Sequence, residues 1–306
     1  MPRSPPNRNC GSAILASEAA LAAPAGTDFA HQYDVRAWVP DFAGSLAEWT
    51  ARAGFARATH PGLLDLRYGP AEAETLDLFL PAGDGPHPLL VFLHGGFWRR
   101  LHKDDFSWVA PPYGDRGVAV AVVNYGLAPG TTLEDIVTQV RRSLAWLYRG
   151  ADCYRIDRRR IVVGGHSAGG HLAAMALATD WPAAANDLPA ELLAGGIALS
   201  PLADLAPLAT VPVLHADLDF TPSRVAGLSP CRLSPATSAP VLGAVGGRES
   251  PEFHRQLGML AWAWAPVWRG TVSMPDDDHL SLCDAFVTPS SPLFQRSLAL
   301  LRGLPG

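Results

Sequence analysis

A serine inside a short glycine motif is the strongest chemical signal in the sequence. Gly165-His166-Ser167-Ala168-Gly169 follows an apolar run at residues 161–163 and precedes a helix-compatible stretch. This G-x-S-x-G spacing is typical of a tight strand-to-helix turn, where the serine hydroxyl is exposed and the flanking glycines permit close backbone approach. The alternative is a glycine-rich turn that happens to contain a serine. The flanking strand and helix patterns favour Ser167 as a nucleophile for acyl transfer.

A second glycine motif offers backbone hydrogen-bond donors. Leu93-His94-Gly95-Gly96-Phe97-Trp98 closes another apolar run. The amides of Gly95 and Gly96, together with that of Ala168 at a helix N-terminus, are expected to form an oxyanion hole. His94 is expected to brace this loop rather than to touch substrate. Phe97 and Trp98 are candidates for a substrate pocket, with ordinary packing as the open alternative.

A nucleophilic serine needs a base, and ten histidines compete for that role. His279 follows three aspartates, 276–278, in a predicted loop after the run at 271–274. Enzymes whose nucleophilic serine lies on such a strand-to-helix turn carry their catalytic residues in the chain order serine, acid, histidine. This order favours His279. His254 is the rival, but it falls inside a predicted helix. A metal site formed by the aspartates and His279 is a further alternative, although three successive carboxylates cannot all face one cation.

The acid is predicted in the loop that follows the apolar run at 240–245. Glu249 lies in this loop, between Ser167 and His279 in the chain. Glu252 is the alternative, but Ser250 and Pro251 predict a helix start that places Glu252 in the first turn. A carboxylate there complements the helix dipole without any catalytic role. We therefore predict Glu249 as the residue that orients the base.

The elements that must position these residues follow an alternating pattern. Short apolar runs bounded by glycine predict buried strands, and apolar residues at helical spacing predict helices between them. Such alternation indicates an α/β fold with a mainly parallel sheet, helices on both faces and a site at the carboxyl ends of the strands. The predicted strands are 63–68, 75–80, 88–93, 118–123, 161–163, 195–199 and 240–245, and the predicted helices include 132–147, 251–262 and 292–301.

Composition limits the remaining possibilities. The 306 residues are 48% hydrophobic and 17% charged, which is typical of a globular domain. A formal net charge of -5 gives nucleic acid no electrostatic reason to bind, and no apolar run reaches 18 residues, so neither nucleic acid nor membrane is expected as a partner. No NAD or ATP motif occurs, and no cofactor or metal is expected. Four widely spaced cysteines favour the reducing cytoplasm.

The N-terminal segment sets the predicted domain boundary. Residues 14–25 resemble a short signal region, but Glu18 interrupts it. We expect residues 1–30 to form a flexible tail and residues 31–306 a single domain. A homodimer is compatible with the sequence.

Together these motifs resemble the α/β-hydrolase fold, and specifically the arylformamidase (kynurenine formamidase) group and related carboxylesterases with an HGG oxyanion loop. The resemblance covers most of residues 31–302. It implies a Ser167, Glu249 and His279 triad, with the backbone amides of Gly95, Gly96 and Ala168 as oxyanion donors. Phe97, Trp98 and His166 are our candidates for substrate binding. The family often has aspartate at the Glu249 position. The resemblance also rests on the segments QYDVRA at 32–37, DLFLP at 77–81, VNYGLAP at 123–129, where Gly126 replaces the arginine of related esterases, and SPEFHRQ at 250–256.

The resemblance implies a serine hydrolase that works through an acyl-enzyme. Its expected reaction is the conversion of N-formylkynurenine to kynurenine and formate, in tryptophan breakdown. A carboxylesterase for short-chain or aromatic esters is the close alternative, because it would use the same residues. A non-catalytic binding protein on the same fold is the third possibility, but such proteins generally lose the serine or the histidine. The expected partner is a small-molecule amide or ester.

Overall fold

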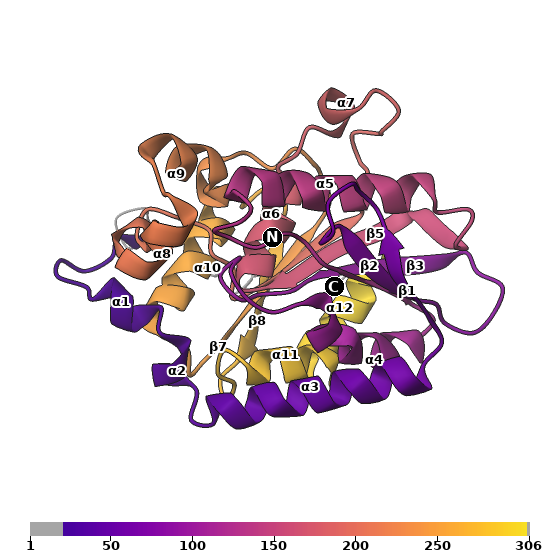
Figure 1. Ribbon diagram of the computed structural model, residues 1–306, viewed down its shortest axis with the longest axis horizontal. Coiled ribbons are helices and arrows are strands. Elements are labelled where there is room, and N and C mark those ends of the chain that lie inside the picture. Colours follow the sequence, from indigo (N-terminus) through magenta and orange to yellow (C-terminus); the bar gives the residue numbers. More distant parts are fainter. Residues whose placement is uncertain (1–20, 305–306) are drawn as a thin grey trace, which may run out of the picture.

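The computed structural model describes residues 21–304 and contains one eight-stranded sheet (Figure 1). The strand order is β1-β2-β4-β3-β5-β6-β7-β8, with β1 and β2 antiparallel to their neighbours and the remaining strands parallel. Each predicted strand is present, which confirms the α/β class. The strands are β1 Gly62–Arg67, β2 Thr75–Phe79, β3 His87–Leu93, β4 Ala119–Val123, β5 Ile156–His166, β6 Gly195–Leu199, β7 Val241–Gly246 and β8 Trp268–Met274.

Helices cover both faces of the sheet (Figure 1). The stripe predicted for 132–147 is present in α5: Leu133, Ile136 and Leu144 are buried, and the Thr132 side chain accepts a hydrogen bond from the Asp135 amide at 3.2 Å. One face carries α5 Leu133–Arg149, α6 Ala168–Leu177 and α10 Pro251–Ala263, and the other carries α4 Ala110–Gly114, α11 Ser281–Val287 and α12 Pro292–Leu301. Among the described residues, no helix has the length and apolarity to cross a membrane.

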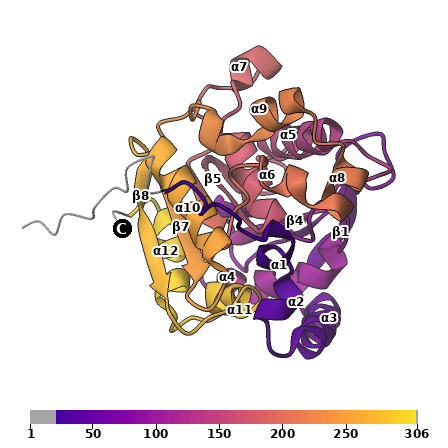
Figure 2. The same ribbon diagram turned by 90° about the vertical axis from the view of Figure 1, so that its left-hand side faces the viewer.

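The longest helix was not predicted from the sequence. α3 Phe42–Thr59 packs against the 3-10 helix η2 Lys103–Val109, and it buries only Trp49, Ala53 and Ala56. This stripe is too narrow and too rich in alanine to produce a clear helical period. Short helices were also not predicted. Those at the carboxyl ends of the strands (Figure 2) are α1 Phe29–Gln32, α2 Val35–Trp38, α8 Pro212–Leu218 and α9 Pro222–Leu228. The others are α7 Trp181–Ala184, η3 Leu208–Thr210 and η4 Pro230–Arg232.

The folded part of the chain begins earlier than residue 31. Leu21 is buried, and its carbonyl accepts a hydrogen bond from Arg255 Nη1 on α10 at 3.2 Å. The Tyr33 hydroxyl donates to Glu252 Oε1 on the same helix at 2.6 Å. Residues 21–30, predicted as part of a flexible tail, therefore include a segment that packs on the domain. Most of the signal-like segment 14–25 lies outside the described residues, as does the rest of 1–20.

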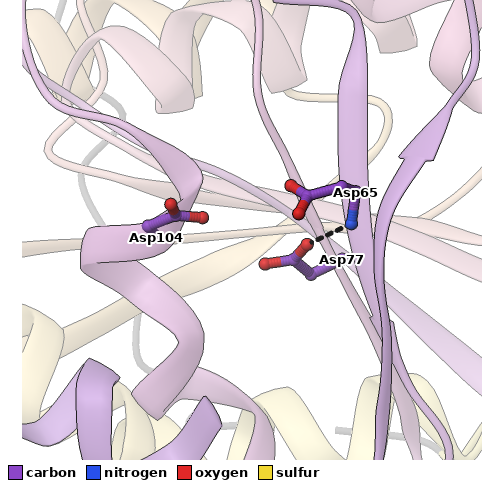
Figure 3. Close-up of side chains that lie close together, drawn as sticks. All are labelled: Asp65, Asp77 and Asp104. Atoms are coloured by element: carbon purple, nitrogen blue, oxygen red, sulfur yellow. Dashed lines mark hydrogen bonds between the residues drawn. The ribbon is translucent and has the colours of Figure 1, made fainter.

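The single lysine of the chain is buried among three carboxylates. Lys103 Nζ lies 2.7 Å from Asp65, 2.8 Å from Asp77 and 2.8 Å from Asp104. Figure 3 shows these aspartates converging from two neighbouring strands and a short helix. Arg57 on α3 also pairs with Asp77 and Asp104. Because an ammonium group already contacts all three carboxylates, we interpret the cluster as an ion-pair network that fixes η2 against β1 and β2.

The network shifts the pKa values of its members. Burial alone would lower the pKa of Lys103, but hydrogen bonds to Asp104, Asp65 and Asp77 outweigh it and raise the pKa above its ordinary value. Burial would raise the pKa of Asp104, but Lys103 holds that pKa below its ordinary range. The carboxylate contribution to stability is therefore present at neutral pH and is lost as the pH falls through the lowered pKa of Asp104.

Lys103→Met is expected to lower the free energy of unfolding by about 3 kcal/mol, because it leaves the buried Asp77 with only part of its charge compensation. Urea unfolding at pH 7, with Arg116→Gln on the exposed surface as the control, measures this effect. The difference between wild type and Lys103→Met should shrink as the pH falls through the lowered pKa of Asp104, where that carboxylate loses its charge. A difference that does not depend on pH would contradict the ion-pair interpretation.

Candidate active site

Ser167 lies on a strained turn between β5 and α6. Its backbone has φ 57° and ψ -118°, in the left-handed region that a residue with a side chain seldom adopts. Its amide donates a hydrogen bond to the Leu199 carbonyl at the end of β6, at 2.8 Å, which holds the turn against the sheet. Strain of this kind persists only where the surroundings enforce it, and it presents the serine at the carboxyl edge of the sheet.

The glycines of the motif are required by close backbone contacts. A Cβ atom on Gly165 would lie 2.2 Å from the Gly169 carbonyl oxygen, and one on Gly169 would lie 1.9 Å from the Leu93 carbonyl oxygen. No side chain fits at either position without moving the backbone. The spacing around Ser167 is therefore a packing requirement of this turn, as the sequence pattern predicted.

His279 and Glu249 form a buried pair from two neighbouring loops. His279 follows β8 and Glu249 follows β7, and the Nδ1 and Oε2 atoms lie 2.6 Å apart. The other carboxylate oxygen accepts hydrogen bonds from the Gly246 amide at 2.7 Å and from the Ser200 hydroxyl at 2.5 Å. These bonds fix the carboxylate, which in turn orients the imidazole. Ser200 was not identified from the sequence, since nothing but its place after a strand distinguishes it.

The rival residues have other surroundings. Glu252 is saturated by the Tyr33 hydroxyl, the Gln256 amide and the Arg255 guanidinium, all within 2.9 Å. His254 is exposed on α10. Neither is placed near His279 by any of these contacts.

The aspartates before His279 also have a structural role. Asp278 Oδ1 accepts hydrogen bonds from the Leu280 and Ser281 amides, each at 2.9 Å, at the start of α11. Asp276 is exposed. Asp278 therefore stabilises the start of this helix.

The Gly95-Gly96 loop approaches the nucleophile closely. A Cβ atom on Gly95 would lie 3.2 Å from Ser167 Cβ. Gly96 has φ 100°, and its carbonyl accepts hydrogen bonds from the Arg99 and Arg100 amides at 3.0 and 3.1 Å. Within the described part of the chain, the amides of Gly95, Gly96 and Ala168 donate to no protein acceptor. They are available to an anionic oxygen beside Ser167.

His94 braces this loop, as the sequence predicted. Its Nδ1 atom lies 2.9 Å from the Gly95 carbonyl oxygen, and its ring stacks on Tyr125 with centroids 4.2 Å apart. The Tyr125 hydroxyl donates to the His94 carbonyl at 2.6 Å. Complete burial lowers the pKa of His94 to about 4, so the ring is neutral at physiological pH.

A cavity of about 570 Å³ joins these residues. Ser167, His279, Gly95 and Gly96 all line it, and residues of α1, α2, α3 and α8 form part of the wall. A larger hollow of about 700 Å³ lies between β1, β2 and α4, and none of the predicted catalytic residues lines it. Because the chemistry-bearing groups share the smaller cavity, we assign the active site there.

The three predicted substrate-contact residues separate in space. Phe97 lines the cavity and packs edge-on against Tyr33, with centroids 6.4 Å apart. Trp98 is fully buried outside the cavity, edge-on to His171 at 4.9 Å. Both have positive φ values, 52° and 56°, and this tight turn sends the two aromatic side chains to different surroundings. Trp98 is thus a core residue beneath the loop.

His166 lies beside the catalytic candidates. It lines the cavity, and its ring centroid is 4.4 Å from that of His279. Burial and the neighbouring His279 hold the pKa of His166 well below its ordinary value. His166 is therefore neutral: it packs against the His279 ring and does not compete with it for a proton.

Several cavity residues were not predicted from the sequence. Tyr33 and Val35 come from the N-terminal segment, Trp49 from α3, and Val211 and Leu214 from the region of α8. Most belong to elements too short to show a period. The sequence distinguishes the segment 32–37 only through its resemblance to a family, and this resemblance does not indicate a place in the cavity wall.

Comparison with known proteins agrees with this geometry. The family model BD-FAE matches residues 76–187. A kynurenine formamidase from Danio rerio is 34% identical over 242 residues, which cover 74% of this chain and 78% of that protein. One from Salmo salar is 30% identical over 266 residues, covering 84% and 87%. A solved structure from Silicibacter sp. TM1040, provisionally described as a thioesterase, aligns with a TM-score of 0.79 at 29% identity, covering 90% of this chain and 100% of that one.

The sheet, the turn at Ser167 and these similarities define the chain as an enzyme of the α/β-hydrolase fold. Its activity is that of a hydrolase, of the arylformamidase or esterase type. The chain belongs to the kynurenine formamidase family.

Proposed function

We propose that this chain is a serine hydrolase that cleaves an aryl formamide, with N-formylkynurenine as the substrate, through a Ser167, His279 and Glu249 triad. The observation that carries the proposal is the 2.6 Å contact between Glu249 and His279, because His279 lines the same cavity as the strained Ser167. The family relatives named as kynurenine formamidases support the choice of a formamide.

The proposed reaction begins with attack by Ser167 Oγ on the formyl carbon, while His279 accepts the hydroxyl proton. Negative charge develops on the carbonyl oxygen, where the amides of Gly95, Gly96 and Ala168 stabilise it. His279 then gives its proton to the departing aryl amine, and the C–N bond breaks. Water, deprotonated by His279, attacks the formyl-enzyme and releases formate and free Ser167. Glu249 holds the imidazole in the required tautomer throughout.

Ester cleavage is the second candidate function, because the same groups would act on a short acyl ester. The Silicibacter neighbour, described as a thioesterase, favours this alternative. The cavity of about 570 Å³ also has room for a leaving group other than an aryl amine.

The two functions are separated by a ratio of rate constants. We expect kcat/KM for N-formylkynurenine to exceed that for p-nitrophenyl butyrate by at least about tenfold, since a site suited to a formyl group discriminates against the larger butyryl group. Ser167→Ala supplies the background rate for each substrate. A ratio well below one, with Ser167-dependent ester cleavage, would replace the formamidase proposal with the esterase one.

We further propose that the reaction serves tryptophan breakdown in the cytoplasm. Cys153, Cys231 and Cys283 are unbridged thiols, which is compatible with a reducing compartment. Fractionation of cells that express the full chain, followed by assay for kynurenine formation, tests this placement.

A further inference from the structure

Two arginines that line the active-site cavity are exposed to solvent. Arg36 on α2 and Arg100 in the loop after Gly96 both line the cavity. Within residues 21–304 neither guanidinium makes an ion pair or a hydrogen bond. The third arginine of the wall, Arg99, differs because it pairs with Asp217 on α8 at 2.5 Å. Two cationic groups at the cavity are therefore free to bind an anion.

Both groups are tied to cavity structure. The Arg36 guanidinium lies over the ring of Phe42, itself a cavity residue, at 5.5 Å from the centroid. The Arg100 amide donates to the Gly96 carbonyl at 3.1 Å, so Arg100 begins from a backbone position fixed by the proposed oxyanion loop. The cation–π contact limits where the Arg36 charge can lie, and the backbone bond fixes where the Arg100 side chain begins.

The charge balance at the cavity differs from that of the molecule. The chain carries a formal net charge of -5. Asp34 is the one carboxylate among the described residues that line the cavity, and its Oδ1 atom accepts a hydrogen bond from the Arg36 amide at 3.3 Å. With Arg99 neutralised by Asp217, the wall is net cationic. A cationic cavity on an acidic protein selects for anionic ligands.

We propose that Arg36 and Arg100 are specificity-determining residues that bind a carboxylate of the substrate, remote from the bond that is cleaved. The inference rests on the proposed function, because it places the reacting carbonyl at Ser167 and Gly96. Arginine binds carboxylate through paired N–H donors, and such charge-assisted bonds correspond to a preference of about 10- to 100-fold. In the proposed substrate, N-formylkynurenine, this group is the carboxylate of the amino-acid side chain.

The test uses a matched pair of formamides, 3-(2-formamidobenzoyl)propanoate and its neutral primary amide. We expect wild type to favour the anion by at least about tenfold in kcat/KM at low ionic strength, with the preference falling as salt screens the charges. In Arg36→Gln/Arg100→Gln the ratio of anion to amide should approach one. Arg116→Gln, an exposed arginine outside the cavity, should retain the wild-type ratio.

A second pair, 4-acetoxyphenylacetate and 4-acetoxyphenylacetamide, separates this proposal from the proposed function. If wild type cleaves only the esters, the formamidase proposal fails, and the anion preference is then read from the ester pair with the same variants. An unchanged ratio in the double variant, or no preference in wild type, overturns the carboxylate assignment. An equal loss on the anion and the amide also overturns it, because it would assign the arginines a structural role.

Discussion

Ser167→Ala is expected to lower kcat/KM by at least about 10⁴-fold while leaving the fold intact. The hydroxyl lies on a strained turn beside the Gly95 loop, and alanine keeps the Cβ atom that this turn already accommodates. Steady-state assays with N-formylkynurenine and with a p-nitrophenyl ester measure the loss. Thermal unfolding verifies that the variant is folded.

Ser223→Ala provides the matched control, because Ser223 is exposed on α9 and does not line the cavity. It should keep wild-type activity. A serine-directed phosphonate should label wild type and Ser223→Ala at Ser167 and fail to label Ser167→Ala. Turnover by Ser167→Ala at the wild-type rate would disprove the nucleophile assignment.

Glu249→Gln is expected to lower kcat by about 10³- to 10⁴-fold. Glutamine preserves the shape of the side chain but removes the charge that stabilises protonated His279, and its amide group favours the wrong imidazole tautomer. The Gly246 amide and the Ser200 hydroxyl would also face a neutral group in place of a carboxylate. Single-turnover rates at saturating substrate measure the chemical step directly.

Glu252→Gln is the matched control, three residues further along the chain. Its carboxylate binds Arg255, Tyr33 and Gln256, so its loss should reduce stability by about 1 to 3 kcal/mol and change kcat by less than about tenfold. If Glu252→Gln proves more damaging to kcat than Glu249→Gln, the acid assignment fails.

The parts of the fold that could be predicted are those with continuous signals. The buried strands appear as uninterrupted apolar runs, and the amphipathic α5 has a wide apolar stripe. The carboxyl ends of parallel strands meet at one edge, which is why Ser167, Glu249 and His279, distant in sequence, could be expected to converge there. The structure places Glu249 and His279 in contact. Ser167 and His279 line the cavity, and Glu249 does not.

The parts that could not be predicted depend on tertiary contacts. Helix α3 is recognisable only through Trp49, which packs on Phe106 and Trp108 from η2. Phe97 and Trp98 are adjacent and chemically similar, and only the turn at positive φ decides which one meets the cavity. Arg36 and Arg100 look like ordinary surface charges until the fold brings α2 and the Gly96 loop to the same wall. Sequence patterns carry local periodicity, whereas these features arise from segments that meet across the fold.

The buried position of Lys103 has a consequence for the chemistry of the whole surface. Because it is the one lysine of the chain and its side chain is inaccessible, the described fold presents no lysine amine to solvent. Acylating reagents, and enzymes that acetylate or ubiquitinate lysine, can reach this amine only when η2 separates from β1 and β2. The rate at which Lys103 becomes acylated therefore measures how often η2 separates from β1 and β2, and no probe has to be introduced.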